Sequence, residues 1–414
     1  MTLSIKPNLA IPAPLRGSET GTFTHYSIAG RLPDIGRRIL AENQFRSHIV
    51  AELEDLFDGI PHAPIRPLTD TYAPDAADWR TYCLPYLEQD WLQAPWFFVE
   101  TYFYRRVMEA TDYFQEGAAT QGYDPFAYQK QQGLTTQIPA IRSMCTAVTR
   151  WLAKPKAKEQ GLTTLLHADL WGNQADLSLW PVGQPTDSPA GQNAQPDSKD
   201  AHDAFLLADD TTAVITHLLS LPQPARIDLI ADNAGFELVA DLCLVDYLLG
   251  SNTAVTVHLH LKAHPTFVSD ALIKDAEATI RFLANDKDEN TRMVGKRLGE
   301  MLGNGRLRLQ THFFWTSPLP MWDLPTALSA ELGRAHLVIS KGDANYRRLL
   351  ADRHWPATTP FPDILSYFPA PILALRTPKS EIICGLGEGQ AEETAVQDPN
   401  WLTNGTRGVI QFAP

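Results

Sequence analysis

Three oxygen-bearing side chains stand after two apolar runs in the middle of the chain. Asp232 and Asn233 follow the run at 226–231, and Asp270 follows the run at 254–261 after a short loop. Carboxylate and amide oxygens suit hard cations such as Mg²⁺ or Mn²⁺, and three such ligands leave positions open for water and a phosphate oxygen. A metal held in this way can polarise a phosphoryl group and activate an attacking water molecule. The residues therefore indicate a metal site for phosphate-ester chemistry.

A competing interpretation of Asp232 and Asn233 is structural. Asp and Asn are favoured just before the first turn of a helix, where they accept hydrogen bonds from free backbone N–H groups. The apolar stretch that begins at Phe236 predicts a helix at this place. The residue types at positions 232 and 233 alone are equally compatible with helix capping and with metal binding.

Basic and polar side chains follow the other apolar runs in the same way. Because the carboxyl ends of parallel strands meet at one edge of a sheet, we expect these side chains to lie near the three candidate ligands. The residues concerned are Lys262, Lys341, Asp343, Asn345, Arg347, Arg376 and Lys379. Arg347 and Lys379 could hold the remaining phosphate oxygens and stabilise charge in the transition state.

Other suggestive motifs have simpler explanations. His258 and His260 alternate along one run and should face the same side, where packing against a helix is the expected role. The aromatic run at 313–315 could wall a pocket or pack in the core. The glycine-rich segment at 385–389 lies too near the chain end for a complete βαβ unit to follow, so we expect a turn there.

These residues must be positioned by strands and helices, which the sequence predicts from alternating short apolar runs, loops and amphipathic stretches. The predicted strands are 226–231, 254–261, 307–314, 335–340, 371–375 and 408–412. Helices are expected at 236–249, at about 268–283 and from residue 346 onward. The repetition of strand, loop and helix predicts an α/β fold with a mostly parallel sheet covered on both faces.

The first part of the chain has a different character. Apolar residues at three- and four-residue spacing predict helices at 78–87, 96–110 and 134–152. Near residue 181 the composition shifts to Pro, Gly, Gln, Asp and Ser, which predicts a mobile surface segment. The expected division is a mainly helical N-terminal portion at 1–180, a Pro/Gly/Gln-rich segment at 181–203 and an αβα core at 204–414.

Composition narrows the class of protein. The 414 residues are 44% hydrophobic and 20% charged, as in ordinary soluble globular proteins. A net charge of −13 argues against a broad nucleic-acid surface, because phosphate backbones attract clustered Lys and Arg. No signal peptide or membrane-spanning run is visible, and the four cysteines form no CxxC pair. We expect buried free thiols and a cytoplasmic protein without nucleic-acid or membrane partners.

Several sequence blocks, in order, resemble the metal-dependent damage-control phosphatase family, formerly a domain of unknown function. The resemblance is to its RTxK-containing branch, which includes acidic residue methyltransferase-like proteins. The blocks ETYFYRR, LWGNQADLS, DNAGFEL, KAHPTFVSD, KGDANYR and RTPK begin at Glu100, Leu170, Asp232, Lys262, Lys341 and Arg376. Ala175, Ala234 and Thr266 stand where the family is expected to have Cys, Ser and an aromatic residue, which affects the expected pocket shape.

The resemblance implies a three-layer αβα sandwich with a helical N-terminal portion. It also implies that Asp232, Asn233 and Asp270 are metal ligands and catalytic residues. Mn²⁺ is the expected ion, with Ni²⁺, Co²⁺ or Mg²⁺ as alternatives. The residues implied to bind substrate are Glu100, Gly342, Asp343, Asn345, Tyr346, Arg347, Arg376 and Lys379.

We therefore expect a phosphoric monoester hydrolase acting on a small phosphorylated metabolite, a sugar phosphate of the fructose-1-phosphate or fructose-6-phosphate type. Direct attack by water and an aspartyl-phosphate on Asp232 are both compatible with the residues. The alternative is an S-adenosylmethionine-dependent protein carboxyl (glutamate) O-methyltransferase, although no early strand ends in a glycine-rich loop suited to that cofactor. A non-catalytic binding protein of the same fold is a third possibility, which the complete set of candidate ligands and cations disfavours.

Overall fold

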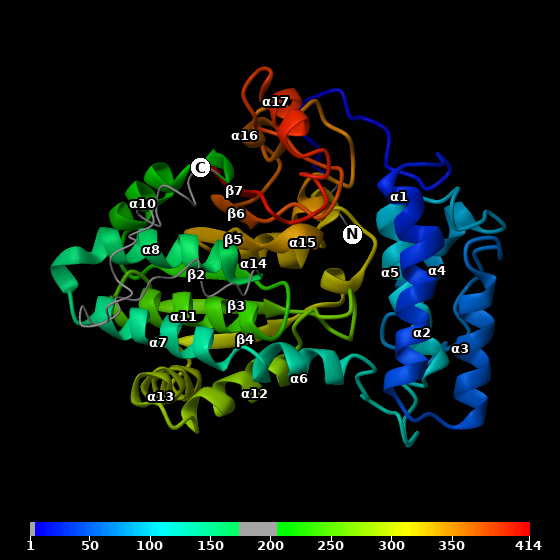
Figure 1. The fold of residues 1–414 in the computed structure, drawn as a ribbon, viewed down its shortest axis with the longest axis horizontal. Coiled ribbons are helices and arrows are strands. Elements are labelled where there is room, and N and C mark those ends of the chain that lie inside the picture. Colours follow the sequence, from blue (N-terminus) through cyan, green and yellow to red (C-terminus); the bar gives the residue numbers. More distant parts are fainter. Residues whose placement is uncertain (1–4, 174–204) are drawn as a thin grey trace, which may run out of the picture.

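The computed structural model describes residues 5–173 and 205–414, and a sheet of seven strands lies at its centre (Figure 1). The strand order across the sheet is β1-β7-β6-β5-β2-β3-β4. The strands are β1 (Leu206–Asp209), β2 (Arg226–Ile230), β3 (Thr256–Leu261), β4 (Leu307–Thr311), β5 (Leu337–Lys341), β6 (Ile372–Arg376) and β7 (Gly408–Ala413). All neighbouring pairs are parallel except β6 and β7, which confirms the prediction of a mostly parallel sheet.

The strands differ from the predicted ones at two places. The predicted run at 307–314 ends as a strand at Thr311, and Phe313–Thr316 forms a 3₁₀ helix. Strand β1 was not predicted, because it has only four residues, of which only Leu207 is buried. Its signal is too short to read from the sequence.

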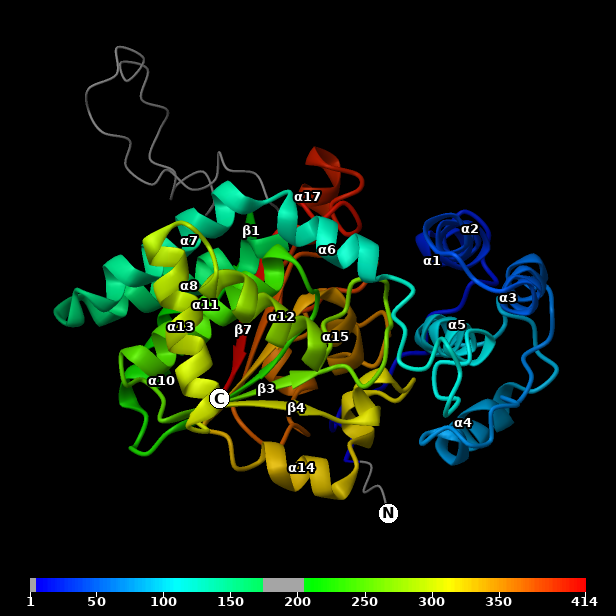
Figure 2. The same cartoon turned by 90° about the horizontal axis from the view of Figure 1, so that it is seen from below.

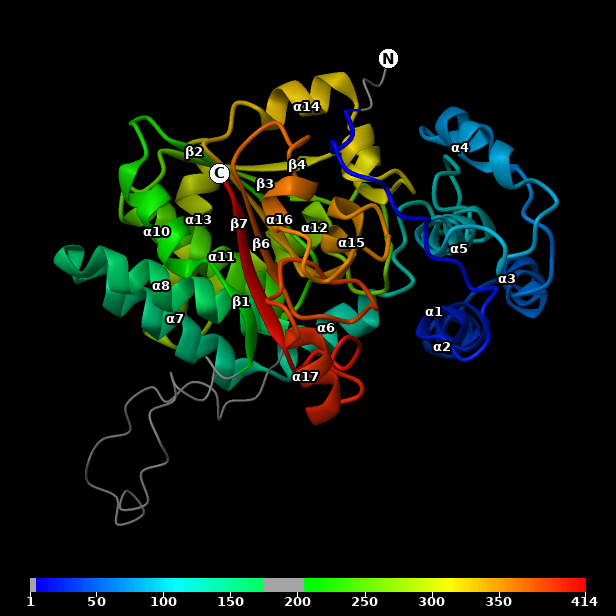
Figure 3. The ribbon, with the colours of Figure 1, turned by 90° about the horizontal axis from the view of Figure 1, so that it is seen from above.

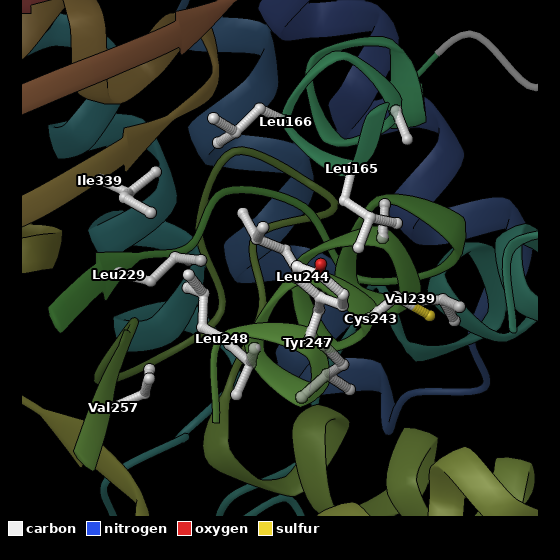
Figure 4. Close-up of a cluster of buried hydrophobic side chains, with 14 of the residues drawn as sticks. Leu165, Leu166, Leu229, Val239, Cys243, Leu244, Tyr247, Leu248, Val257 and Ile339 are labelled. Atoms are coloured by element: carbon white, nitrogen blue, oxygen red, sulfur yellow. The ribbon is translucent and has the colours of Figure 1, made fainter. Parts of the chain in front are cut away.

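One face of the sheet is covered by six helices that share a continuous apolar core with it. They are α7 (Ile138–Leu152), α8 (Lys158–Leu170), α10 (Thr211–Ser220), α11 (Phe236–Gly250), α12 (Ile273–Ala284) and α13 (Glu289–Gly303). Helix α11 is buried along almost its whole length, since it lies between the sheet and α7 and α8. Figure 4 shows Leu244 and Leu248 of α11 between side chains of the strands and those of α8.

Shorter helices cover the opposite face around a second apolar core. They are the 3₁₀ helices Phe313–Thr316 and Met321–Asp323, with α14 (Thr326–Leu332), α15 (Gly342–Leu349) and α16 (Phe361–Ile364). Figure 3 shows α11 and α16 on opposite sides of β6 and β7. Helix α17 (Gln390–Gln397) follows on the surface. The expected αβα layering is therefore present.

The N-terminal helices form a bundle beside the sheet, next to α15 (Figures 1 and 2). The bundle consists of α1 (Phe23–Tyr26), the π-helix Ser27–Arg31, α2 (Leu32–Glu42), α3 (Ser47–Gly59), α4 (Ala76–Cys83) and α5 (Trp96–Ala110), and it has its own apolar core. The helix predicted at 96–110 coincides with α5, whereas the one predicted at 78–87 ends as an α-helix at Cys83.

The helix predicted at 134–152 is interrupted. Helix α6 (Ala127–Thr135) ends just before α7, whose second residue is Pro139. Proline has no N–H to donate and disfavours helical backbone in the residue before it, so one helix cannot run through this point. Helices α7 and α8 precede residue 180 yet share the core of the sheet, while the division of the chain into three regions stays a prediction. The predicted segment at 181–203 lies outside the described residues.

None of the described helices combines the length and apolar character that a membrane crossing requires. All four cysteines, which lie in the described part of the chain, are buried free thiols, as predicted.

The close contact between α12 and α13 yields a stability prediction. A Cβ at Gly295 would lie 2.1 Å from the backbone nitrogen of Ala284, whereas a Cβ at Gly299 on the same helix meets nothing within 4 Å. We expect Gly295→Ala to lower the free energy of unfolding by about 1 to 3 kcal/mol, because α12 must move away. Gly299→Ala should raise it by up to about 1 kcal/mol, because alanine favours the helix. Urea denaturation of both variants would check this, and equal effects would contradict the packing argument.

Candidate functional site at the carboxyl ends of the strands

The loops after β2 and β3 are tied together by backbone hydrogen bonds. The N–H of Ala271 donates to the carbonyl of Asp232 over 2.8 Å, and the N–H of Ala234 donates to that of Ser269 over 2.7 Å. Asn233 and Asp270 pair as an isolated antiparallel bridge. Asp232, Asn233 and Asp270 are thereby adjacent, although they come from two loops that are far apart in the sequence.

Hydrogen bonds fix the side-chain amide of Asn233. Its Nδ2 donates to Asp232 Oδ2 and to Glu237 Oε2, each over 2.8 Å, and its Oδ1 accepts from Ser269 Oγ over 2.5 Å. The competing prediction that Asp232 and Asn233 cap the next helix is wrong, because Gly235 occupies the capping position of α11 and no side-chain cap bond is formed.

Two carboxylate oxygens of this group are left without hydrogen bonds in the described part of the chain. They are Asp232 Oδ1 and Asp270 Oδ2, both of which are buried. Among the described residues the ion-pair partner of Asp270 Oδ2 is the ammonium of Lys262, at 3.2 Å. Buried polar atoms are normally satisfied, so these carboxylate oxygens indicate that a group other than the described residues completes the site.

The pKa values of the buried carboxyl groups also favour a bound cation. Burial, together with the neighbouring carboxyls of Asp270 and Glu237, raises the pKa of Asp232 well above its usual range. Burial raises the pKa of Asp270 despite the opposing Lys262, and burial also raises the pKa of Glu237. Charging these carboxyl groups inside the protein costs free energy, which a cation at the same place would offset.

The donor set fits a hard divalent cation. Among the described residues no three His, Cys, Asp or Glu side chains form a metal-holding group, so the candidate set reaches three ligands only by including the amide of Asn233. Two carboxylates and an amide oxygen are the donor types that Mg²⁺ and Mn²⁺ accept.

Gly342, at the start of α15, is in close contact with Asp232. Its φ is +79°, and a Cβ at this position would lie 1.9 Å from Asp232 Oδ2. Only glycine combines this backbone conformation with such an approach. Further along the helix, Asn345 accepts a hydrogen bond from Lys262 Nζ over 3.1 Å and donates to the carbonyl of Ala231 over 3.1 Å.

The segment after β6 is held by Asp343. Its Oδ1 accepts from Arg376 Nε at 2.8 Å, from the Lys379 N–H at 3.0 Å and from Ser380 Oγ at 3.0 Å. Burial opposes ionisation, yet Arg376 holds the pKa of Asp343 below its usual range. Arg376 also stacks on the ring of Tyr346, 4.2 Å from its centroid. In the described residues the exposed ammonium of Lys379 makes no ion pair, so it is available to a ligand.

Arg347 connects α15 to the helical bundle. It forms ion pairs with Glu100 of α5 and with Asp352, the latter over 2.7 Å, and its guanidinium lies 3.6 Å from the ring centroid of Trp96. Its Nη2 is buried and makes no hydrogen bond with any described residue. Glu100 thus contacts Arg347, and also accepts from Ser27 Oγ over 3.2 Å.

Comparison with known proteins gives the same family as the sequence blocks. Residues 26–394 match the damage-control phosphatase ARMT1-like domain. The chain belongs to this family. It is 33% identical to damage-control phosphatase ARMT1 of Rattus norvegicus and 31% identical to that of Homo sapiens, each over 97% of this chain and 98% of the relative. A crystal structure of a DUF89 family protein from Pyrococcus horikoshii aligns with a TM-score of 0.47 at 13% identity, covering 94% of this chain and 98% of the other.

Membership of the damage-control phosphatases confirms the expectation of a phosphoric monoester hydrolase. The structure gathers the sequence-predicted residues at one edge of the sheet, but their surroundings differ. Three atoms of the set form no hydrogen bond with a described residue, and they are Asp232 Oδ1, Asp270 Oδ2 and Arg347 Nη2. Of these, Asp270 Oδ2 lies 3.2 Å from the Lys262 ammonium. Other members of the set make internal contacts, and these are Glu100, Asn233, Asp343, Asn345, Tyr346 and Arg376.

Sequence reasoning overlooked two groups that hold the candidate ligands. Glu237 and Ser269 both bond to the amide of Asn233. The spacing of four residues between Asn233 and Glu237 at a helix start is a signal that could have found the first.

Lys341 has a different place from the one expected. Its ammonium is buried beneath the site, where it donates to Asp169 over 2.7 Å and to Asp241 over 2.6 Å. These carboxylates hold the pKa of Lys341 above its ordinary value, although burial alone would lower it. Lys341 therefore supports the site from below.

His258 and His260 are buried and bonded to neighbouring strands. His260 Nε2 lies 2.9 Å from Asp228 Oδ2, and His258 Nδ1 lies 3.2 Å from Gln310 Nε2. The His260 ring meets Trp315 of the 3₁₀ helix Phe313–Thr316 edge-on, which agrees with the predicted packing against a helix. The hydrogen-bonded neighbour of His258 is a strand residue instead.

A pocket of about 570 Å³ lies elsewhere, between α8 and α10 beside Asp209 at the end of β1. Because β1 and β7 run opposite to β6, this is the other edge of the sheet. Its Asp209 and Thr211 bond to each other at the start of α10, which is an ordinary helix-start arrangement.

The unfavourable charge of Asp232 yields a pH-dependent prediction. Since the pKa of Asp232 is raised on folding, its ionised form destabilises the metal-free protein above the unfolded pKa. Asp232→Asn should therefore raise the free energy of unfolding by about 1 to 3 kcal/mol near pH 7, and by less near pH 5. Urea denaturation of the EDTA-treated protein at both pH values measures this.

Asp228 is the matched control, because it is equally buried but paired with Arg226 and His260, which hold its pKa below the usual range despite burial. Asp228→Asn should lower the free energy of unfolding by about 3 kcal/mol. Loss of stability in both variants would contradict our account of Asp232.

Proposed function

We propose that this chain is a metal-dependent phosphatase in which Asp232, Asn233 and Asp270 hold the divalent metal. The observation that carries the proposal is a pair of buried carboxylate oxygens on adjacent segments, Asp232 Oδ1 and Asp270 Oδ2. Neither forms a hydrogen bond with a described residue, and only Asp270 has an ion-pair partner there, the ammonium of Lys262. Mn²⁺ is the favoured ion, and Ni²⁺, Co²⁺ and Mg²⁺ have related preferences. When bound, the metal would polarise the phosphoryl group and supply an activated water.

The phosphate group is proposed to lie between this site and the ends of β5 and β6. Helix α15 begins at Gly342, beside Asp232, and the first turn of a helix presents free backbone N–H groups to an anion. Lys379 contributes a nearby positive charge that favours ionised Asp232. Arg347 Nη2 is the third group available for the phosphate oxygens.

The remaining predicted substrate-binding residues are proposed to act mainly by fixing these groups in place. Asp343 and Arg376 hold the backbone at Lys379, and Glu100 holds Arg347. Asn345 fixes Lys262, which in turn lies beside Asp270. Tyr346 supports Arg376 through ring stacking.

For the substrate we propose a sugar phosphate of the fructose-1-phosphate or fructose-6-phosphate type. A small anionic metabolite fits a protein whose overall charge is −13 but whose site gathers Lys262, Arg347 and Lys379 locally. Lys262 and Arg347 are paired with carboxylates, so the attraction for an anion would come from Lys379 together with the bound metal.

The first test is phosphate release from a panel of sugar phosphates and p-nitrophenyl phosphate. EDTA-treated protein should be inactive, and added Mn²⁺ should restore turnover. Asp270→Ala should lower turnover by at least about 100-fold at saturating metal, because a charged ligand is lost. Asp288→Ala is the matched control, since that partly buried aspartate caps α13 away from the site and its loss should leave turnover unchanged.

Full activity of Asp270→Ala at saturating metal would contradict the proposed ligand set. Absence of phosphate release with every metal would contradict the proposed reaction, and calorimetry with S-adenosylmethionine would then test the methyltransferase alternative.

A further inference from the structure

The loop that carries Asp270 contains two consecutive residues in a strained backbone conformation. Phe267 has a φ of +46° and Val268 a φ of +68°. Left-handed backbone is costly for side chains other than glycine, and most of all for a β-branched residue such as valine. Such a conformation persists only where the surroundings impose it.

The helical bundle supplies those surroundings. The Phe267 ring lies 5.8 Å from the ring of Phe97 and 5.3 Å from that of Tyr104, both on α5. Phe267 and Val268 are partly buried against the apolar core of the bundle, not against the core of the sheet to which their loop is connected. Aromatic contacts of this kind stabilise beyond the buried area alone.

On the other side, the strained pair continues directly into the candidate metal site. Ser269 donates from Oγ to Asn233 Oδ1 over 2.5 Å, and its carbonyl accepts from the N–H of Ala234 over 2.7 Å. The next residue is Asp270, which pairs with Asn233 in the backbone bridge. Only one residue therefore separates the strained pair from Asp270.

We propose that Phe267 is a positioning residue for the metal site: its packing against α5 holds the strained loop in the conformation that places Asp270 and Ser269 beside Asn233. Docking of the helical bundle then sets the metal affinity of a site to which, in this structure, the bundle contributes no ligand. This inference rests on the proposed function, because it assigns the bundle a role toward the same metal. If Phe267 served only general stability, any equally buried aromatic residue of the bundle would have the same effect.

Phe98 is the matched control. It lies on α5, the helix that carries Phe97 and Tyr104, and it is 3% exposed. Its ring contacts are Trp79, Tyr86 and Tyr102, away from the loop. Phe267→Ala removes a partly buried ring that packs on the bundle, and Phe98→Ala removes a buried ring within the bundle. Only the first removes the contact that holds residues 267 and 268.

The experiment is calorimetric titration of the EDTA-treated full-length protein with whichever of Mn²⁺, Mg²⁺, Co²⁺ and Ni²⁺ the wild type binds most tightly. We expect Phe267→Ala to raise the dissociation constant by about tenfold or more, the range seen when supports of metal ligands are removed. Phe98→Ala should leave the constant within about twofold of the wild type. Phe267→Leu, which keeps apolar volume and so protects folding, should raise it by about threefold because the ring contacts are lost.

The metal dissociation constants of the wild type and the three variants decide whether Phe267 positions the metal site. Weaker binding in the Phe267 variants alone supports the inference. Unchanged binding in Phe267→Leu and in Phe267→Ala, or equal weakening in Phe98→Ala, overturns it while leaving the metal site intact. Failure of the wild type to bind any of the four metals overturns the proposed metal site and the inference with it.

Discussion

Mutual repulsion between buried carboxyl groups is the constraint on which the rest of the site depends. Asp232 and Asp270 lie on adjacent segments, and Glu237 is close enough to raise the pKa of Asp232 further. A folded protein tolerates such a cluster only if other parts of the chain enforce it. Three features hold the carboxyl groups close together: the backbone hydrogen bonds between the two loops, the amide of Asn233 and the glycine at position 342. In the proposed function, the same repulsion is the driving force for metal binding.

A second layer of charges lies below the first. Lys341, at the end of β5, is enclosed by Asp169 of α8 and Asp241 of α11, and its charge also favours ionised Glu237. Carboxylate and ammonium groups thus alternate from the interior of the helical layer toward the loops. Because each group is stabilised by the next, the position of the upper carboxylates depends on residues deeper in α8 and α11.

The sequence allowed accurate prediction where a signal is local. Strands β2, β3, β5 and β6 are almost entirely buried and rich in Ile, Leu and Val, so the residues that follow them could be assigned to one edge of the sheet. Apolar periodicity is read over a stretch of many residues. It therefore misses short features such as the helix break at Pro139 and the four-residue strand β1. The antiparallel direction of β7 also lacks a local signal, because it depends on the path of the preceding connection.

Long-range pairing of cations was the part that could not be predicted. Lys341 finds Asp169 at a separation of 172 residues, and Arg347 finds Glu100 at a separation of 247. Nothing in the neighbouring sequence distinguishes these buried cations from the exposed Lys379. The left-handed backbone at Phe267 and Val268 could not be predicted from the sequence either, since neither residue type favours that conformation.

The position of β7 has a consequence for the order in which the protein can assemble. In the described sheet β1 pairs with β7 alone, and β7 also pairs with β6. During synthesis β1 and β6 both leave the ribosome before β7 exists, so each then presents an unpaired edge to its surroundings. Such edges invite pairing with other chains. The last strand of the sheet therefore closes a gap between β1 and β6 that stays open until β7 has been made.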